Sequence, residues 1–426
     1  MTMTVLVAPS GFKESLSVNA VTKSISKGIL RAMPDARILQ APMVDGGEGT
    51  TEALVRATGG AIIPACVTGP VGEPVDSFYG ILGGPGPRTA VIEMAAAAGL
   101  SLVPQDCRNP MLTTSYGVGE LILHALDTGV EKILIGCGDS GINDGGAGLA
   151  QALGARLLDE EGAEIGRGGA ELMWLHRIDM SDLDRRLRSV RIDVAVNWHN
   201  MLLGPKGVAR VFGPQKGATP TQVDYLDSAL QRWATVIRAE TGLDVGTAQG
   251  AGASGGLGAG LMAFAGATLH PRFDIMMQYL DFDRLLDQAD LVITAEGSLD
   301  GQSPYGKVPC EVARRAADRD IQTVALAGTI GKGVDQTFSH GISAFASILK
   351  RPCTLEEAIR DGDQLLRRAA EDAMRMMCVG LRMSQKKRSH MHERDAGGFL
   401  ARQLCHSHQA RAILFDGIRR IEIRHK

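Results

Sequence analysis

Apolar and polar positions follow two patterns along most of this chain: short apolar runs, and apolar residues that recur at helical spacing. The apolar run Val5–Ala8 is closed by proline and glycine, which is typical of a short buried strand. Apolar residues then recur from Val18 to Ile29 at helical spacing, and Ser15 or Ser17 can cap that helix. The same order of strand and helix repeats through much of the chain. Strands predicted in this way are Val5–Ala8, Ile38–Ala41, Val91–Met94, Lys132–Ile135, Val194–Val196, Leu291–Thr294, Thr323–Ala327 and Ala344–Ile348.

Two longer helices carry clear end signals. One is predicted over Thr221–Thr241, where apolar residues share one face and Gly242 follows as a stop. The other is predicted over Leu355–Met377, and Thr354 with Glu357 forms a capping-box pattern at its start. Because helices lie between most of the predicted strands, the fold class is α/β with parallel sheets. Ligands of such folds bind at the carboxyl ends of the strands.

Clusters of proline and glycine indicate where the chain divides into domains. The segment Gly83–Pro87 predicts one boundary, and a second is expected near Asp283–Asp290. The last predicted strands resemble the first two, so the two ends of the chain are expected to form one doubly wound domain. The predicted units are residues 1–82 with 285–384, residues 83–284, and a tail of residues 385–426.

Composition narrows the class of protein further. The chain has 426 residues, of which 44% are hydrophobic but only 4% aromatic, so its cores must be largely aliphatic. No apolar stretch approaches the roughly 18 residues of a membrane-spanning helix, and the start of the chain lacks the basic segment of a signal peptide. The seven cysteines are dispersed without a C-x-x-C pair. The dispersed cysteines predict a reduced, cytoplasmic protein without a zinc site. The lack of a long apolar stretch predicts that the protein has no membrane partner.

Positive charge is concentrated in the last part of the chain. Residues 385–426 hold ten Lys and Arg against four Asp and Glu, although the whole chain carries a net charge of −3. A basic tail of this kind can bind nucleic acid. A solvated extension is the simpler interpretation, because the segment lacks the glycine-rich, aliphatic character of the remainder. Nucleic acid is therefore not an expected partner.

Five glycine-rich loops, four of which contain acids or lysines, give the clearest sign of chemistry. Glycine allows backbone N–H groups to approach an anion closely, carboxylates can hold Mg²⁺, and lysine can neutralise phosphate. The G-x-x-x-x-G-K-[ST] sequence of P-loop enzymes is absent. The loops therefore predict phosphoryl transfer on a different kind of kinase scaffold. They are Asp45–Thr50, Asn143–Gly148, Phe212–Ala218, Gly252–Gly260 and Thr294–Lys307.

The first loop places Asp45 and Glu48 three residues apart, with Gly46 and Gly47 between them. Their carboxylates can converge on Mg²⁺ or orient a substrate hydroxyl. An acidic helix N-terminus is the alternative, since the helix predicted at Thr51–Thr58 follows directly. The surrounding glycines favour a functional loop, with Asp45 as a catalytic residue. Gly46, Gly47 and Glu48 are then expected to contact the nucleotide.

The last loop holds a second acidic pair, directly after the strand Leu291–Thr294. Glu296 and Asp300 lie at the carboxyl end of that strand and are candidate ligands of Mg²⁺. Lys307 follows them and is a candidate catalytic residue that reaches a phosphate or the substrate carboxylate. An ordinary surface lysine is the alternative at that position.

Two further lysines and a pair of glycines complete the phosphate-binding candidates. Lys13 lies between the first strand and its helix, whose N-terminus is a natural anion site, and it is predicted to be catalytic. Lys216 is expected to contact the nucleotide, because the glycines near it imply a tight approach. Gly255 and Gly256 are expected to do the same, although a glycine pattern alone is weak evidence for a nucleotide site.

Three more polar residues follow predicted strands. Asn143 and Asp144 come after Lys132–Ile135 and are expected near the nucleotide, although Asp144 can cap a helix instead. His199 follows Val194–Val196 and is a candidate general base or substrate contact. A lone histidine more often packs or forms structural hydrogen bonds, which is the alternative here.

The ordered set of loops resembles that of the type I bacterial glycerate kinases, from about Val5 to about Met383. The motifs that carry the resemblance are APSGFKESLS, PMVDGGEGT, GINDGGAG, HNMLLGPKGVARVFGPQKGA, GASGGLGAG and TAEGSLDGQSPYGK. The resemblance implies two α/β domains, one with a flavodoxin-like doubly wound parallel sheet and a second of mixed α/β type. It places the active site in the cleft between them. It also implies Mg²⁺, ATP as co-substrate, and transfer to the 2-hydroxyl of D-glycerate, giving 2-phosphoglycerate and ADP.

Two positions differ from the pattern of that family. Ser10 stands where the family often has Asp, and Asn197 stands where it often has the Asp of a C-D-x-x-N motif. An amide takes up no proton near neutral pH, so His199, Asp45 or a water molecule would have to act as the base. Two alternatives stay open: a kinase of another small hydroxy acid, and a non-catalytic relative that only binds a metabolite or nucleic acid.

Overall fold

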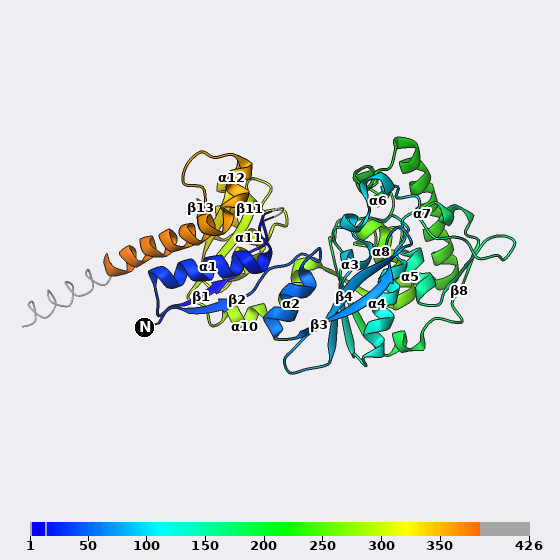
Figure 1. Cartoon of the computed structure of the whole chain (residues 1–426), viewed down its shortest axis with the longest axis horizontal. Helices are drawn as coiled ribbons and strands as arrows, with labels where there is room; N and C mark the ends of the chain where they lie inside the picture. Colours follow the sequence, from blue (N-terminus) through cyan, green and yellow to red (C-terminus); the bar gives the residue numbers. More distant parts are fainter. Residues whose placement is uncertain (1, 13–14, 384–426) are drawn as a thin grey trace, which may run out of the picture.

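Two β-sheets organise the chain, which the computed structural model describes at residues 2–12 and 15–383. Figure 1 shows the sheets in two lobes of an elongated molecule, with both ends of the described chain in the same lobe. Most strands are short aliphatic segments that helices cover, so the predicted α/β class is confirmed. Within the described residues, none of the helices is both long enough and apolar enough to cross a membrane.

The first lobe holds a parallel five-stranded sheet of order β13-β12-β11-β1-β2. Numbered within the lobe, this is the 2-1-3-4-5 order of flavodoxin-like folds, which confirms the predicted doubly wound sheet. Its strands are β1 (Thr4–Val7), β2 (Arg37–Gln40), β11 (Leu291–Leu299), β12 (Gln322–Ile330) and β13 (Ile342–Ser347). Its helices are α1 (Val18–Ala32), α10 (Phe282–Leu286), α11 (Val308–Ala317), α12 (Leu355–Arg360) and a last helix of residues 362–383.

Strand β1 shows how helices cover both faces of this sheet. Val5 and Val7 belong to the cluster that includes α1 and the last helix, whereas Leu6 belongs to the cluster on the opposite face. This alternation is the two-residue period of a strand. Helix α1 begins after Ser17, whose hydroxyl accepts the backbone N–H of Ala20, so the second of the two predicted caps is the one used.

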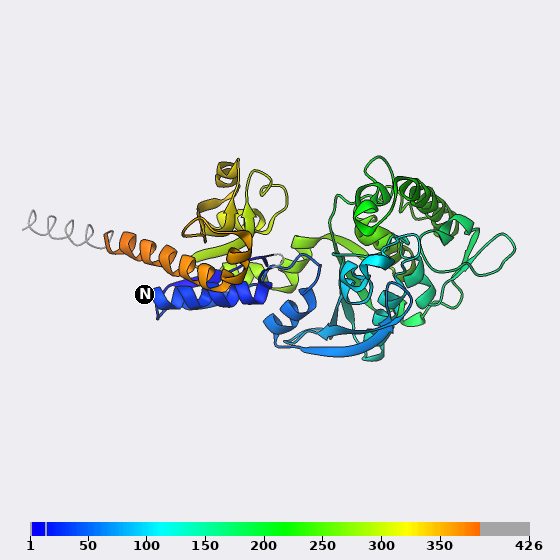
Figure 2. The ribbon, with the colours of Figure 1, turned by 45° about the horizontal axis from the view of Figure 1, so that its top comes forward.

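The helix predicted over Leu355–Met377 is interrupted. Its capping box at Thr354 is confirmed, but α12 ends at Arg360 and a separate helix starts at residue 362. Both Figure 1 and Figure 2 show this last helix alongside α1. The two backbones are in close contact, since a Cβ at Gly28 would lie 2.3 Å from the backbone oxygen of Arg367. The break after Arg360 gives the last helix the direction that this packing requires.

The second lobe holds a mixed six-stranded sheet of order β10-β9-β6-β5-β4-β3, and a two-stranded hairpin lies beside it. Four neighbouring strands are parallel, and β4 and β3 continue the sheet antiparallel. The strands are β3 (Ala61–Thr68), β4 (Pro74–Ile81), β5 (Thr89–Glu93), β6 (Lys132–Gly136), β7 (Arg156–Leu158), β8 (Arg177–Asp179), β9 (Arg191–Val196) and β10 (Thr268–Pro271). The helices are α2 (Thr50–Thr58), α3 (Ala95–Ala98), α4 (Tyr116–Asp127), α5 (Ala147–Ala152), α6 (Val208–Phe212), α7 (Pro220–Thr241), α8 (Ala253–Ala265) and α9 (Arg272–Tyr279).

The edge hairpin of β3 and β4 was not among the predicted strands. Strand β3 is exposed along most of its length and contains Pro64, which an edge strand tolerates, so it has neither a buried apolar run nor a clean alternation. Because this hairpin belongs to the second sheet, the second lobe already begins before the boundary predicted at Gly83–Pro87. That segment is instead the connection from β4 to β5.

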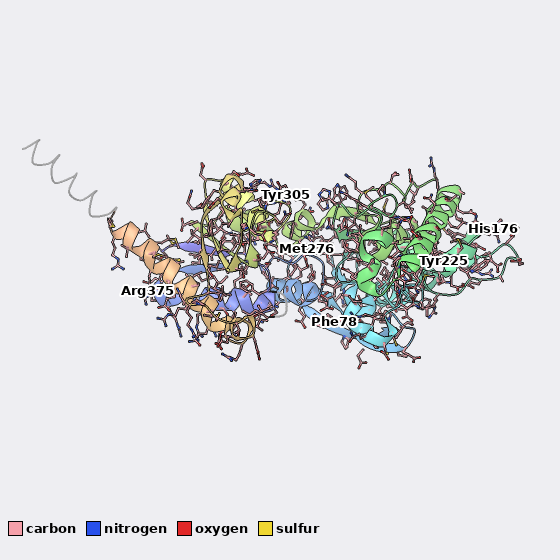
Figure 3. The ribbon with its side chains drawn as sticks, turned by 90° about the horizontal axis from the view of Figure 1, so that it is seen from above. Phe78, His176, Tyr225, Met276, Tyr305 and Arg375 are labelled. Atoms are coloured by element: carbon pink, nitrogen blue, oxygen red, sulfur yellow. The ribbon has the colours of Figure 1, made fainter. Side chains whose placement is uncertain are left out.

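Helix α9 joins the two lobes. Its residue Met276 is fully buried in a cluster that contains Leu6 of the first sheet and Val91 of the second. Figure 3 shows Met276 in the region between the lobes. The lobes are therefore connected by a shared apolar core as well as by the chain itself.

Candidate active site

A cleft of about 1230 Å³ opens between the two lobes, at the carboxyl ends of their parallel strands. In the first lobe it lies where β1 neighbours β11, the point at which the strand order reverses and folds of this class bind ligands. Ser10 follows β1 there, and Glu296 lies in the final part of β11. From the second lobe, Asp139 follows β6 and Arg272 follows β10. Strand ends of both sheets thus contribute to one lining.

The loop Asp45–Thr50 crosses from the first lobe to the second along this cleft. Asp45 and Glu48 both line it. Gly46 and Gly47 are buried behind them, Gly46 with a φ of 89° against the end of β6. A Cβ at Gly47 would lie 2.2 Å from Oδ2 of Asp139. The glycines predicted to approach the nucleotide therefore allow the loop to approach the second lobe.

Two carboxylates hold this loop in place. The backbone N–H of Glu48 donates to Oδ2 of Asp139 at 3.0 Å, and its side chain accepts from the Ser101 hydroxyl at 2.6 Å. Glu93 at the end of β5 accepts the backbone N–H of Thr51 at 2.9 Å and so caps α2. Burial raises the pKa of Glu93. No pattern singled out Glu93, and its only sequence signal is a carboxylate that ends a buried strand.

The two acids of the second predicted pair, Glu296 and Asp300, lie in different environments. Asp300 accepts hydrogen bonds from Nζ of Lys307 at 3.1 and 3.2 Å and from the backbone of Gln302 at 2.9 Å. Lys307 also donates to the backbone oxygen of Ser298 at 3.1 Å. Glu296 lines the cleft, and its Oε2 is buried without a hydrogen-bond partner in the described part of the chain. The structure therefore brings Glu296, Asp300 and Lys307 together, but the Asp300 carboxylate is already bound to the Lys307 ammonium.

The carboxyl of Glu296 has an unusual electrostatic environment. Burial raises the pKa of Glu296 to about 7, and the nearby Asp300 and Asp45 act in the same direction. Lys307 and Arg272 act in the opposite direction without cancelling the cost of burial. A carboxyl that titrates near neutral pH inside a cleft is typical of functional sites.

Arg272 is a lining residue that no sequence pattern indicated. Its guanidinium lies 3.4 Å from Oδ2 of Asp45 and 3.4 Å from the backbone oxygen of Gly306. It also lies over the ring of Phe273, 4.7 Å from the ring centroid. The residue starts α9 directly after β10, a strand of only four residues that ends in proline. Leu269 is the only large apolar residue in this strand, so there is no apolar run by which its end could be found.

Asp144 is fully buried and lies outside the lining of the cleft. It accepts from the backbone of Ser115, Gly146 and Gly148 and from the Ser115 hydroxyl, at 2.7 to 3.2 Å. It thereby holds the starts of α4 and α5, which is the capping role that the sequence left as an alternative. Asn143 beside it is also fully buried, and within the described residues neither polar atom of its side chain has a partner.

Lys216 and two predicted glycines also lie behind the cleft surface. Lys216 is 2% exposed and donates to the Ser140 hydroxyl at 3.0 Å and to the backbone oxygen of Ile142. Burial lowers the pKa of Lys216 to about 7. Gly255 and Gly256 are buried with positive φ, and a Cβ at Gly255 would lie 2.0 Å from the Ile142 oxygen. These residues support the loop of Ser140, which does line the cleft.

Of the two remaining predicted catalytic residues, His199 and Lys13, the structure describes only His199. His199 is exposed and is not a lining residue, and its backbone N–H donates to the side chain of Asn197 at 3.2 Å. This bond closes a local turn after β9, and asparagine is a residue that commonly forms such a turn. Ser10 lines the cleft, and its hydroxyl donates to the backbone oxygen of Ala295 at 3.1 Å. Lys13 lies outside the described residues, as does the predicted tail.

Comparisons with known proteins cover nearly the whole described chain. The model of the glycerate kinase family matches residues 5–378. The glycerate kinase of Bacillus subtilis strain 168 is 47% identical over 370 residues, which are 87% of this chain and 96% of that protein. The glycerate 2-kinase of Escherichia coli K12 is 46% identical over 380 residues, which are 89% of this chain and 99% of that protein.

A solved structure has a similar fold. The crystal structure of a glycerate kinase 2 from Salmonella typhimurium LT2 matches with a TM-score of 0.80 at 45% sequence identity. The match covers 90% of this chain and all of that one. The two-lobed α/β fold is therefore shared with these relatives.

Proposed function

The chain belongs to the glycerate kinase family, and we propose that its cleft transfers the γ-phosphoryl group of ATP to the 2-hydroxyl of D-glycerate. The products would be 2-phosphoglycerate and ADP. The observation that carries the proposal is a cleft lined by Asp45, Glu296 and Lys307 at the reversal point of a flavodoxin-like sheet. Phosphoryl transfer depends mainly on positioning and on neutralising charge, which acids and lysines around one cleft can supply. The printed name of the Escherichia coli relative supports the 2-hydroxyl as acceptor.

Asp45 is the proposed acceptor of the hydroxyl proton. Its side chain is 44% exposed in the cleft, and its contact with Arg272 is long at 3.4 Å. The substrate oxygen attacks the γ-phosphorus, the bond to the bridging oxygen breaks, and ADP leaves. Lys307 offers positive charge to the transferred group while Asp300 keeps it oriented. Asn197 and His199 are not needed in this scheme, and Lys13 stays a predicted catalytic residue.

The residues predicted to bind the nucleotide fall into two groups, one at the cleft surface and one buried behind it, and we propose a different role for each group. Glu48 lies at the cleft surface, and Gly46 and Gly47 shape the loop beneath it. The buried group supports the second-lobe side of the same cleft through the loop that ends at Ser140. That group consists of Asn143, Asp144, Lys216, Gly255 and Gly256.

Mg²⁺ fits one member of the predicted acidic pair. Oε2 of Glu296 is a buried oxygen without a partner in the described residues, and carboxylate oxygen is the ligand that Mg²⁺ prefers. Asp300 would first have to release Lys307. No group of three His, Cys, Asp or Glu in the described chain is arranged to hold a metal alone. Mg²⁺ in kinases takes one or two carboxylates together with substrate phosphates, and it would neutralise their charge here.

The cellular setting proposed for this reaction is the cytoplasm. The six cysteines of the described chain are all free. Reduced cysteines are typical of proteins kept in a reducing compartment.

A coupled assay tests the proposed reaction. Purified protein with ATP, Mg²⁺ and D-glycerate should release ADP only when glycerate is present. Enolase should convert the product without the help of a phosphoglycerate mutase, because enolase acts on 2-phosphoglycerate and not on 3-phosphoglycerate. Lys307→Ala should lower kcat by roughly 100-fold, since it removes a charge that stabilises the transition state.

Lys350 provides the matched control for this variant. It is an exposed lysine paired with Asp372, far from the lining, so Lys350→Ala should keep full turnover. A product that enolase ignores would refute transfer to the 2-hydroxyl. No glycerate-dependent ADP from folded protein would refute the substrate, and a panel of tartronate, lactate and hydroxypyruvate would then be the next comparison.

A further inference from the structure

Arg272 sits on an unusually well-braced part of the cleft wall. It lies between His270 of β10 and Tyr279 at the end of α9, and both of these side chains bond to Asp193. The distances are 2.8 Å to His270 and 3.1 Å to Tyr279, and the Asp193 side chain is 1% exposed. A buried carboxylate thus fixes the elements on either side of Arg272. Sites held by such packed elements are positioned more precisely than sites on loops.

The guanidinium itself is held only loosely. Among the described residues it makes two hydrogen bonds, to Asp45 and to the backbone of Gly306, and both are 3.4 Å long, well beyond the usual 2.9 Å or so. A guanidinium has five N–H donors and accepts no hydrogen bonds, so most of its capacity is unused by these contacts. The side chain remains 29% exposed in the cleft.

Lys307 differs from Arg272 in this respect. Its ammonium makes three hydrogen bonds of 3.1 to 3.2 Å, two of them to Asp300. It acts as a compact point charge, a form that suits a phosphate. The planar fork of an arginine can instead bind two oxygens at once, those of a carboxylate or of a phosphate. The two cations therefore offer different kinds of recognition within one cleft.

We propose that Arg272 binds the carboxylate of the hydroxy-acid substrate, which takes the place of Asp45 as its partner. This inference rests on the proposed function and names the residue that selects an acid over a neutral alcohol. One carboxylate would replace another, because Arg272 already faces the carboxylate of Asp45 at 3.4 Å. It leaves the Asp45 carboxylate without its cationic partner and able to accept the proton of the reacting hydroxyl.

The position of Asp45 explains why the hydroxyl next to the carboxylate reacts. In a 2-hydroxy acid the reacting oxygen is attached to the carbon that carries the carboxylate. A carboxylate seated on Arg272 therefore brings that oxygen toward the nearest acid, which is Asp45. The more distant 3-hydroxyl would lie one carbon further away.

Two substrates and two variants test the assignment. D-glycerate and its neutral amide, glyceramide, differ only in the group that Arg272 is assigned to bind. For Arg272→Gln, the KM for glycerate should rise about 100-fold with little change in kcat, as expected when binding of ground and transition states is lost equally. The kcat/KM for glyceramide and the KM for ATP should each change less than about threefold, within the scatter of a neutral change. Arg272→Lys should fall between Arg272→Gln and the parent protein.

Arg284 supplies the matched control, because it is an exposed arginine on α10 paired with Asp281. Arg284→Gln should leave both KM values unchanged. An increase in the KM for ATP with an unchanged KM for glycerate would assign Arg272 to the phosphate instead and overturn the proposal. Equal losses with glycerate and glyceramide, or no loss with either, would overturn it as well.

Calorimetric titration of D-glycerate separates this proposal from the proposed function. Parent protein that binds glycerate without phosphorylating it, beside an Arg272→Gln variant that does not bind it, would refute the reaction and support the assignment of Arg272. Phosphorylation by the parent together with unchanged binding by the variant would support the reaction and overturn the assignment. If the parent binds no glycerate, both are refuted.

Discussion

Lys216 is the residue whose burial has the clearest thermodynamic consequence. It is 2% exposed, and desolvation lowers its pKa from 10.5 to about 7 in the folded protein. Between pH 7 and 10.5 the unfolded chain therefore holds a proton that the folded chain has released. Under that condition the free energy of unfolding rises with pH. Lys216→Met removes the titrating group and should remove this rise.

Urea denaturation at pH 7 and at pH 9 measures the effect. The parent protein should gain roughly 2 kcal/mol relative to Lys216→Met over these two pH units, because one full proton contributes about 1.4 kcal/mol per unit. Lys350→Met is the control, since Lys350 is an exposed lysine and should follow the parent. Curves for the parent and Lys216→Met that stay parallel would mean that Lys216 keeps its charge despite burial.

At the scale of elements, the contact of α1 with the last helix depends on one missing methyl group. A Cβ at Gly28 would lie 2.3 Å from the backbone oxygen of Arg367 and 2.8 Å from the Cβ of Ala370. Neither neighbour is the flexible end of a side chain. Gly28→Ala should therefore lower the free energy of unfolding by about 2 kcal/mol, as overpacked cores do, despite the higher helix propensity of alanine.

Gly380 provides the opposite case in the same pair of helices. It lies in the last helix with nothing within 4 Å of a Cβ placed there. Gly380→Ala should leave stability unchanged or raise it by about 0.5 to 1 kcal/mol through helix propensity alone. If both variants behaved alike in urea denaturation, the close approach at Gly28 would not be a determinant of stability.

Elements could be predicted from the sequence where one periodicity prevails. Central strands such as β1 are buried on both faces, so their apolar runs were visible, and the caps at Thr354 and Gly242 were legible. The edge strand β3 and strand β10 carry no such signal, because β3 is largely exposed and β10 is only partly buried with a single large apolar residue. The interruption after Arg360 depends on packing against α1, which no local pattern records.

The candidate site follows the same division between local and distant causes. Asp45 was found because it lies with Glu48 in a glycine-rich loop, and Glu296 was found because it follows a recognisable strand, whose end lies at the binding edge in this fold class. Arg272 was missed because it follows β10. The glycine-rich loop of Asp144 was read as a surface for ligand, but its carboxylate bonds to Ser115, 29 positions earlier in the chain. Burial by distant segments is the information that composition and spacing do not contain.

At the scale of the whole molecule, the two sheets meet at a core shared through α9, with the cleft at their common carboxyl edge. Glu48 bonds to Ser101 and Asp139 of the second lobe, and Arg272 reaches Asp45 and Gly306 from β10. These contacts are polar, and the one to Asp45 is long at 3.4 Å. The residues that make these contacts are not members of the buried cluster around α9, and closure over bound substrate would exclude water from the cleft.

The described lining of the cleft runs from Ser10 to Val308, and the family match ends at residue 378. Residues 385–426 lie beyond both limits and outside the described chain. Deleting them should therefore leave kcat and both KM values within about twofold of the full-length protein, the scatter expected of a neutral change. The coupled assay with enolase, run on both forms side by side, is the measurement. A truncated protein that stays folded but loses glycerate-dependent turnover would show that the basic tail takes part in the reaction. A full-length protein that binds single-stranded DNA or RNA through these residues at physiological salt, with turnover unchanged by the deletion, would give the tail a separate role.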